Sequence, residues 1–277
     1  MKKIIIATLS LALGFASCSN EDYLGGHVNR DGAGTALSSL TAQMGSSASG
    51  RTWTGGDKIG VSVSYYDLTA QNRSFLCGED GKSFSAETGV PIYIKGACSV
   101  VAYTPFTGTD GAEPVFEINT ENQDDIPDYL FAKTDGVNPS NGSSVNLTFE
   151  RVLANLKVSI TSTDDVITKW HLNGIYTDAV VNTYNLSLSM AGTKELSDEG
   201  SDISSIDLKL LPQTVDADER EVVLTLFGQK RTYTFTLNAE QALTLTSAQT
   251  TSFNVDIKDG MTTVEIVPAG TVDWKEK

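Results

Sequence analysis

The stretch VVLTLFGQKRTYTFTL, residues 222–237, decides the fold class. It contains two runs, 222–226 and 233–237, that are rich in β-branched and aromatic residues, with Gly228 in the polar segment between them. In the second run Tyr, Phe and Leu alternate with Thr. Alternation with a period of two is typical of a β-strand with one buried face. Both runs are therefore predicted to be strands.

Similar runs recur along most of the chain, separated by clusters of Gly, Asp, Asn and Pro, and no helical pattern longer than one or two turns intervenes. They lie at 59–63, 91–94, 99–103, 145–149, 156–160, 186–188, 206–210 and 253–257. Many short strands with turn signals between them predict an all-β protein, a sandwich or a barrel. The turn cluster at 138–144 marks the expected boundary between a domain at 52–144 and a domain at 145–277.

Composition and chemistry-bearing residues exclude several function classes. The 277 residues carry 35 acidic and 20 basic side chains, a formal net charge of −15. Nucleic-acid binding is not expected, because that affinity comes from clusters of basic residues, whereas acidic side chains outnumber basic ones here. Histidine occurs only at His27 and His171, and neither a G-x-S-x-G nor a D-x-D-x-D-G pattern is present. We expect no enzyme, catalytic residue, metal or cofactor.

The first residues have the pattern of an export signal. Two lysines precede an apolar stretch at 4–15, and small residues lead to Cys18. Residues 15–18, FASC, resemble a bacterial lipobox, so 1–17 are predicted to be a signal peptide and Cys18 to be lipidated. The following SNED at 19–22 resembles a tag for export to the outer face of the outer membrane.

The segment 18–51 is predicted to be a lipidated leader with one removable strand. Gly-rich and Ser-rich stretches flank a short run in which Leu40, Ala42 and Met44 alternate with polar residues. Such a strand would have one buried face and could detach without unravelling its neighbours. Further on, Cys77 and Cys98 form an even pair in an exported protein, so a disulfide between them is permitted and not required.

Six motifs in order resemble the fimbrillin family, whose members are subunits of type V pili. The most specific is WTGGDKIGV at 53–61, which is similar to W-x-x-G-D-x-I-G-V. Arg151 stands where the family often has His. The other five motifs lie at 102–106 (AYTPF), 128–132 (DYLFA), 147–154 (LTFERVLA), 211–213 (LPQ) and 272–274 (VDW).

The resemblance implies two transthyretin-like β-sandwich domains in tandem and assembly by strand exchange. In the family, a trypsin-like surface protease cuts the precursor after an arginine and removes its N-terminal strand. Arg51 is the matching residue here, and Arg30 is the second candidate. A sandwich that loses a strand exposes an apolar groove and two unpaired edges, which an incoming strand can satisfy.

The incoming strand is expected to be the C-terminal tail of another subunit. Val264 and Ile266 alternate before a break at 268–270, and Val272 and Trp274 alternate after it. These four side chains would fill the emptied groove, and the tail would contribute few contacts to its own domain. Pairing within its own domain is the alternative.

The resulting expectation is a structural subunit of a pilus, made as an outer-membrane lipoprotein anchored through Cys18 and carried into the fimbrium after cleavage. Its partners would be other pilus subunits and the surface protease. The alternatives are an uncleaved surface lipoprotein that anchors the pilus and a binder of glycans or host ligands.

Overall fold

The computed structural model describes residues 35–65, 68–94, 96–112, 115–138, 144–258 and 265–273. Within these ranges the regular structure consists of strands and one 3₁₀ turn, η3 (Ser46–Ala48). The prediction of an all-β protein is confirmed. In the described part of the chain, we find no helix with the length and apolarity needed to cross a membrane.

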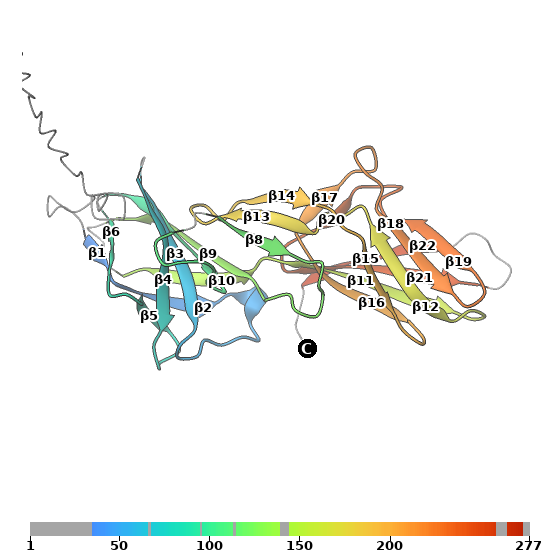
Figure 1. Ribbon diagram of the computed structural model, residues 1–277, viewed down its shortest axis with the longest axis horizontal. Coiled ribbons are helices and arrows are strands. Elements are labelled where there is room, and N and C mark those ends of the chain that lie inside the picture. The colour runs from blue at the N-terminus through green and yellow to red at the C-terminus, as the bar shows by residue number, and fades with distance from the viewer. Residues whose placement is uncertain are drawn as a thin grey trace, which may run out of the picture.

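Seven strands of the N-terminal half form one sheet that closes on itself in the order β10-β2-β5-β4-β3-β7-β9 (Figure 1). A short pair, β1 (Thr35–Leu37) and β6 (Ile92–Ile94), lies beside it. The barrel strands are β2 (Ser39–Met44), β3 (Lys58–Tyr65), β4 (Leu68–Cys77), β5 (Ser83–Ala86), β7 (Cys98–Thr104), β9 (Leu130–Val137) and β10 (Asn146–Arg151).

The sequence predicts a sandwich over 52–144, and the structure differs in two respects. Its strands β3, β4, β5, β7 and β9 close into a single barrel, and the barrel also includes β2 from the leader and β10 from beyond the predicted boundary. Strand β10 pairs with β9 and β2, and its Leu147 and Phe149 are fully buried in the barrel core. The change from the barrel to the second domain therefore falls at Val152 and Leu153. The sequence placed it earlier because alternation identifies a strand without saying which sheet the strand joins.

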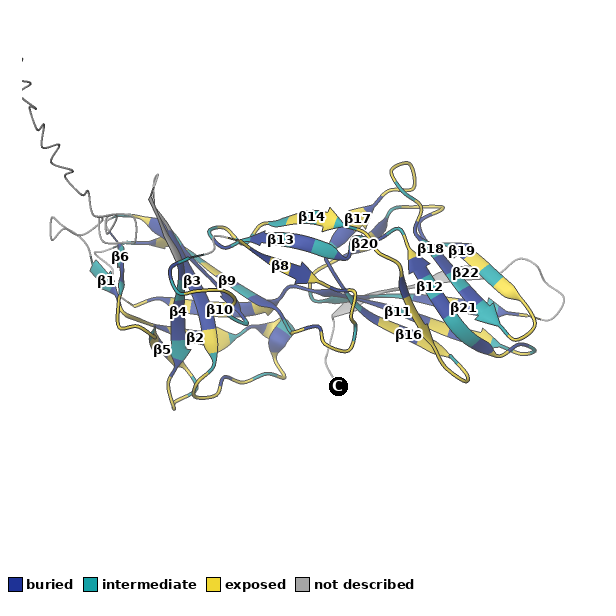
Figure 2. Ribbon diagram, in the orientation of Figure 1, coloured by how far each residue is buried: buried dark blue, intermediate teal, exposed yellow. Residues whose placement is uncertain are grey.

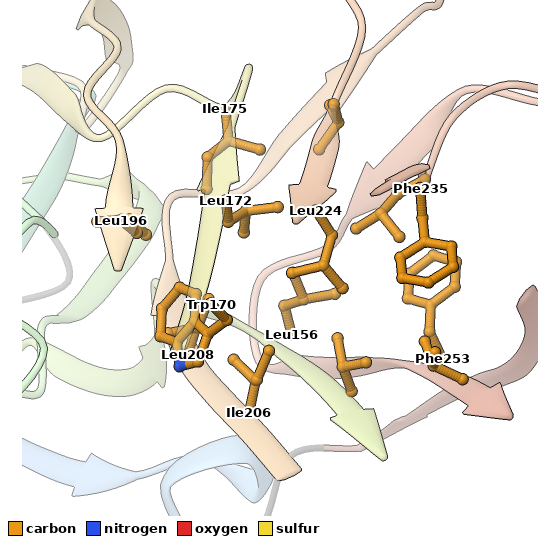
Figure 3. Packing of buried hydrophobic residues seen from close by; sticks show 14 of the residues in the cluster. Leu156, Trp170, Leu172, Ile175, Leu196, Ile206, Leu208, Leu224, Phe235 and Phe253 are labelled. Carbon is orange, nitrogen blue, oxygen red and sulfur yellow. The ribbon is translucent and has the colours of Figure 1, made fainter. Parts of the chain in front are cut away.

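The C-terminal half contains two four-stranded sheets, in the orders β16-β11-β21-β22 and β15-β12-β18-β19. Side chains from both sheets, including Leu156, Trp170, Leu224 and Phe253, meet in one core (Figure 3). The strands are β11 (Ala154–Ser162), β12 (Ile167–Asn173), β15 (Leu196–Glu199), β16 (Ser205–Leu210), β18 (Val223–Gly228), β19 (Thr232–Thr236), β21 (Gln249–Ile257) and β22 (Glu265–Asp273).

A third sheet connects the two halves. Strand β8 (Val115–Asn119) comes from the N-terminal half and pairs with β13 (Asp178–Asn182), which pairs with β14 (Leu188–Gly192). Beneath it, Tyr103 and Phe116 from the first half share a core with Leu211 from the second. A further pair, β17 (Gln213–Val215) and β20 (Leu243–Leu245), completes the described strands.

The motif at 53–61 has a structural explanation. Trp53 packs edge-on against Phe84 and Phe149 of the barrel, each with a centroid separation of 5.0 Å. At Gly60 a Cβ atom would lie 2.2 Å from the ring of Tyr103, so only glycine lets that ring cross the strand. The motif therefore anchors the start of β3 in the core.

Candidate assembly site

Strand β2 completes the barrel between two strands that are distant in sequence. It runs parallel to β10, with Thr41 opposite Asn146 and Met44 opposite Phe149, and antiparallel to β5, with Leu40 opposite Phe84. We call the space between the facing edges of β5 and β10 the seam. The strand predicted at 40–44 is therefore the one that fills the seam.

The leader strand has the predicted buried face. Leu40 and Ala42 are buried, and Met44 packs against the barrel core from a partly exposed position. Upstream, Leu37 of β1 is fully buried as well. Figure 2 colours the strands by burial, and β2 carries both buried and exposed positions. The segment from 35 to 48 is thus integrated into the core of the barrel.

The predicted cleavage site lies between two anchored points. Ala48 of η3 and Trp53 are buried, whereas Ser49, Gly50 and Thr52 between them are exposed and Arg51 is half-buried. The peptide bond after Arg51 therefore lies in a short exposed connection. Arg30, the second candidate, and Cys18 lie outside the described residues.

Arg51 is held loosely by Asp128. Its Nη1 lies 3.2 Å from the Asp128 carbonyl oxygen and 3.4 Å from Oδ2, and the Arg51 side chain is 32% exposed. These are long contacts for charge-assisted hydrogen bonds, which are usually 2.7–2.9 Å. A protease would have little to displace in order to take the Arg51 side chain into its specificity pocket.

A group of polar residues that the sequence analysis left unassigned surrounds the turn after β2. Ser47 donates a hydrogen bond to Glu150 and accepts hydrogen bonds from Arg151 at the end of β10, and Arg151 is paired with Asp128. Its place directly after Phe149 in an alternating run gives Glu150 the pattern of an ordinary solvent-facing strand residue. The signal that could have revealed its role is the small, hydroxyl-bearing sequence Gly45-Ser46-Ser47 directly after the leader strand.

The tail forms a strand within its own domain. Strand β22 pairs antiparallel with β21 from Glu265 opposite Asp256 to Asp273 opposite Gln249, with an irregularity near Pro268. The expectation that the tail contributes few contacts to its own domain is therefore corrected, because it completes a ladder along β21. Ile266 and Val272 lie on this strand, and Val264 and Trp274 fall outside the described residues.

The candidate disulfide is absent. Cys77 and Cys98 are both free and buried. Cys77 lies beside one end of β3, next to the residue that pairs with Lys58, and Cys98 lies beside the other end, next to the residue that pairs with Ser64. At about 3.3 Å per residue, Lys58 and Ser64 are about 20 Å apart along the strand, far beyond the ~7 Å between the Cα atoms of a disulfide. Burial raises the pKa of both thiols.

Within the described ranges we find no group of three or more His, Cys, Asp or Glu side chains arranged to hold a metal ion. His171 lies on β12 with Nδ1 2.9 Å from Glu195 Oε1, and its ring packs against Phe227. This pair lies in the C-terminal domain, away from the seam.

Sequence and structure comparisons identify the family. A family model described as fimbrillin-like matches residues 46–274. The chain therefore belongs to the fimbrillin-like family. The match begins after β2, the strand that fills the seam. No curated protein matches the chain at a significant level.

Several solved structures share the fold over almost the whole chain. A candidate cell adhesion protein from Bacteroides uniformis is 21% identical, with a TM-score of 0.60, and the alignment covers 89% of this chain and 100% of that one. One from Bacteroides ovatus is 20% identical, with a TM-score of 0.61 and coverages of 86% and 98%. The tip fimbrial protein Mfa3 from Porphyromonas gingivalis is 10% identical, with a TM-score of 0.53 and coverages of 86% and 99%.

Proposed function

We propose that this protein is a structural subunit of a type V pilus that supports adhesion. It is exported as a lipoprotein precursor, anchored in the outer membrane through Cys18, and polymerises by strand exchange after a trypsin-like surface protease cuts at Arg51. Family membership and the fimbrial and adhesion descriptions of the related structures support this role. The function is structural and calls for no catalysis.

The observation that carries the proposal is the position of β2. The leader supplies a strand that lies between β5 and β10, yet every other barrel strand follows the exposed connection at 49–52. Loss of the leader would unpair the facing edges of β5 and β10, remove β1 from β6, and uncover Phe84 and Phe149. Such a groove binds an extended strand through backbone hydrogen bonds and side-chain pockets.

The energy at stake is large enough to drive assembly. Leu37 and Leu40 are large apolar side chains of the leader that are buried in the precursor. Burial of each is worth about 1.5–3 kcal/mol, and the ladders to β5 and β10 add to it. A cleaved subunit that has lost its leader is therefore unstable relative to one that has accepted a new strand.

The C-terminal tail remains our proposed donor, through Val264, Ile266, Val272 and Trp274. Within the described ranges β22 is an edge strand that pairs with β21. A strand with one partner can leave its sheet by breaking a single ladder. Insertion into a seam would give it two partners, β5 and β10 of the next subunit.

N-terminal sequencing of protein recovered from the cell surface tests the proposal. A start at Thr52 supports cleavage and strand exchange, and Arg51→Gln should abolish that start and the fibres, whereas Arg30→Gln should not. Recovery of only lipidated Cys18 would contradict the proposal and favour the alternative, an uncleaved anchor or a binder of glycans or host ligands.

A further inference from the structure

The turn after β2 is held on both faces of strand β10. The backbone N–H of Ser47 donates to Glu150 Oε2 at 3.0 Å, and the Ser47 hydroxyl also donates to this oxygen. At the edge of the strand, the Arg151 backbone N–H donates to Ser47 Oγ at 2.9 Å, and from the other face Arg151 Nη1 donates to the Ser47 carbonyl at 2.9 Å. Because adjacent residues of a strand point to opposite faces, Glu150 and Arg151 together enclose Ser47.

The turn fits this site closely. The Gly45 N–H donates to the Phe149 carbonyl at 2.8 Å, which extends the contact of β2 with β10 into the turn. A Cβ atom at Gly45 would lie 1.9 Å from Glu150 Oε1, so any larger residue would push this carboxylate away. Glycine at position 45 therefore leaves the carboxylate free to accept from Ser47.

The Arg151 guanidinium is oriented by a partner that lies outside the leader. The Arg151 side chain is only 3% exposed, and its Nε and Nη2 lie 2.8 Å and 2.9 Å from the two carboxylate oxygens of Asp128. A bidentate pair of this kind fixes the plane of the guanidinium. Arg151 is thus oriented by Asp128, and Nη1 points to the Ser47 carbonyl.

The position of the site relative to the cut decides its role. Gly45, Ser47 and Arg51 all lie on the leader side of the bond between Arg51 and Thr52. Cutting that bond leaves every one of these contacts intact. The contact of Arg51 with Asp128 also stays with the leader.

We propose that Glu150, Arg151 and Asp128 form a clasp for the Gly45–Ser47 turn that retains the leader in the seam after the chain has been cut. Cleavage then removes the covalent link to the leader while the leader still fills the seam. The leader departs when an incoming strand displaces it. This inference deepens the proposed function. It rests on that proposal because it takes the natural cleavage after Arg51 as given.

The test uses a cut that does not depend on the natural protease. A recognition sequence for a sequence-specific protease is inserted between Gly50 and Arg51 in the full chain, purified in detergent. After complete cutting, gel filtration and mass spectrometry measure how much leader remains bound. Excess synthetic peptide of residues 35–50 prevents rebinding, so that the release rate is obtained.

The clasp predicts that the cut protein retains its leader and that Ser47→Ala and Glu150→Gln each speed release about tenfold or more. Combined, the two changes should have less than the product of their effects, because Ser47→Ala removes and Glu150→Gln weakens the same hydrogen bond. Ser49→Ala, in the exposed part of the same segment, is the matched control and should release at the original rate.

Two outcomes would overturn the clasp: immediate loss of the leader from the otherwise unaltered cut protein, or release from both variants at the control rate. Neither bears on whether the protein is a pilus subunit. Conversely, recovery of only lipidated, uncut chains from cells would remove the proposed cleavage, while the retention measured with the inserted site would still stand.

Discussion

Arg151 and Asp128 form a nearly buried, two-pronged ion pair, with Nε 2.8 Å from Oδ1 and Nη2 2.9 Å from Oδ2. Asp128 precedes β9, Arg151 ends β10, and Arg51 of the leader connection approaches the same carboxylate at 3.4 Å. Three segments that are far apart in the sequence therefore meet on one acidic side chain. The pair fixes the end of the seam where the leader leaves the barrel.

Arg151→Ala should destabilise the barrel strongly. It leaves the Asp128 carboxylate, only 14% exposed, without its bidentate partner. Removing one member of a buried ion pair typically costs about 3–5 kcal/mol. Urea unfolding followed by tryptophan fluorescence would measure the loss. Lys133→Ala, which breaks an exposed pair with Asp135, should leave the midpoint nearly unchanged, and an equal loss in both variants would contradict this argument.

Leu40→Ala should weaken the precursor by about 2–5 kcal/mol, because it opens a cavity in the barrel core. Differential scanning calorimetry of the uncut chain would detect the loss. Ser38→Ala changes an exposed residue just before β2 and serves as the control. If Leu40→Ala left the transition unchanged, β2 could not be an integral strand of the barrel.

The parts of the fold that the sequence predicted are those with local signals. Alternation located β2 and its buried residues Leu40 and Ala42, and the motif at 53–61 located the start of β3. Alternation also identified β10, but its assignment to the second domain was wrong. Its partners, β2 and β9, could not be read from 145–149 alone, since strand pairing depends on residues distant in sequence.

The polar contacts of the seam could not be predicted from the sequence for the same reason. Ser47 and Glu150 are 103 residues apart, and each has the pattern of a surface residue when taken alone. For the cysteines, the sequence allowed a contact that the fold does not make. Their even number permitted a bridge, but only the topology reveals that Cys77 and Cys98 lie toward opposite ends of β3.

The turn that leads into β5 should make stability sensitive to acid. The Ser83 hydroxyl, followed by the backbone N–H groups of Ser83 and Lys82, donates to the Asp80 carboxylate and lowers its pKa from 3.8 to about 2. A carboxyl whose pKa is depressed in the folded state adds stability above its unfolded pKa. This contribution is lost as the pH falls through the folded value, here between about pH 4 and about pH 2.

Asp80→Asn should therefore be less stable than the parent chain near neutral pH, and the two should converge as the pH approaches about 2. Urea midpoints measured across this range would show the convergence. Ser83→Ala removes the strongest donor and should lose part of the same slope. Asp80→Asn with an unchanged acid slope would exclude Asp80 as its source.

The tail offers the sharpest test of assembly. A chain that ends after Lys258 lacks β22, which exposes the outer edge of β21 but leaves the parallel ladder between β21 and β11. Strand β22 belongs to the sheet β16-β11-β21-β22, and the barrel is a separate sheet. We expect the truncated chain to fold, with a lower transition temperature for the C-terminal domain and an unchanged one for the barrel.

After cleavage, this truncated subunit should accept a strand and be unable to donate one. Alone it should form no fibres. Added in small amounts to full-length cleaved subunits, it should end each growing fibre and so shorten the fibres. Electron microscopy would measure both outcomes. The uncut truncated chain keeps β2 in its seam and should shorten nothing, so it is the matched control. Fibres from the truncated, cleaved protein alone would exclude the tail as donor, and global unfolding on truncation would assign β22 to a permanent place in its own domain.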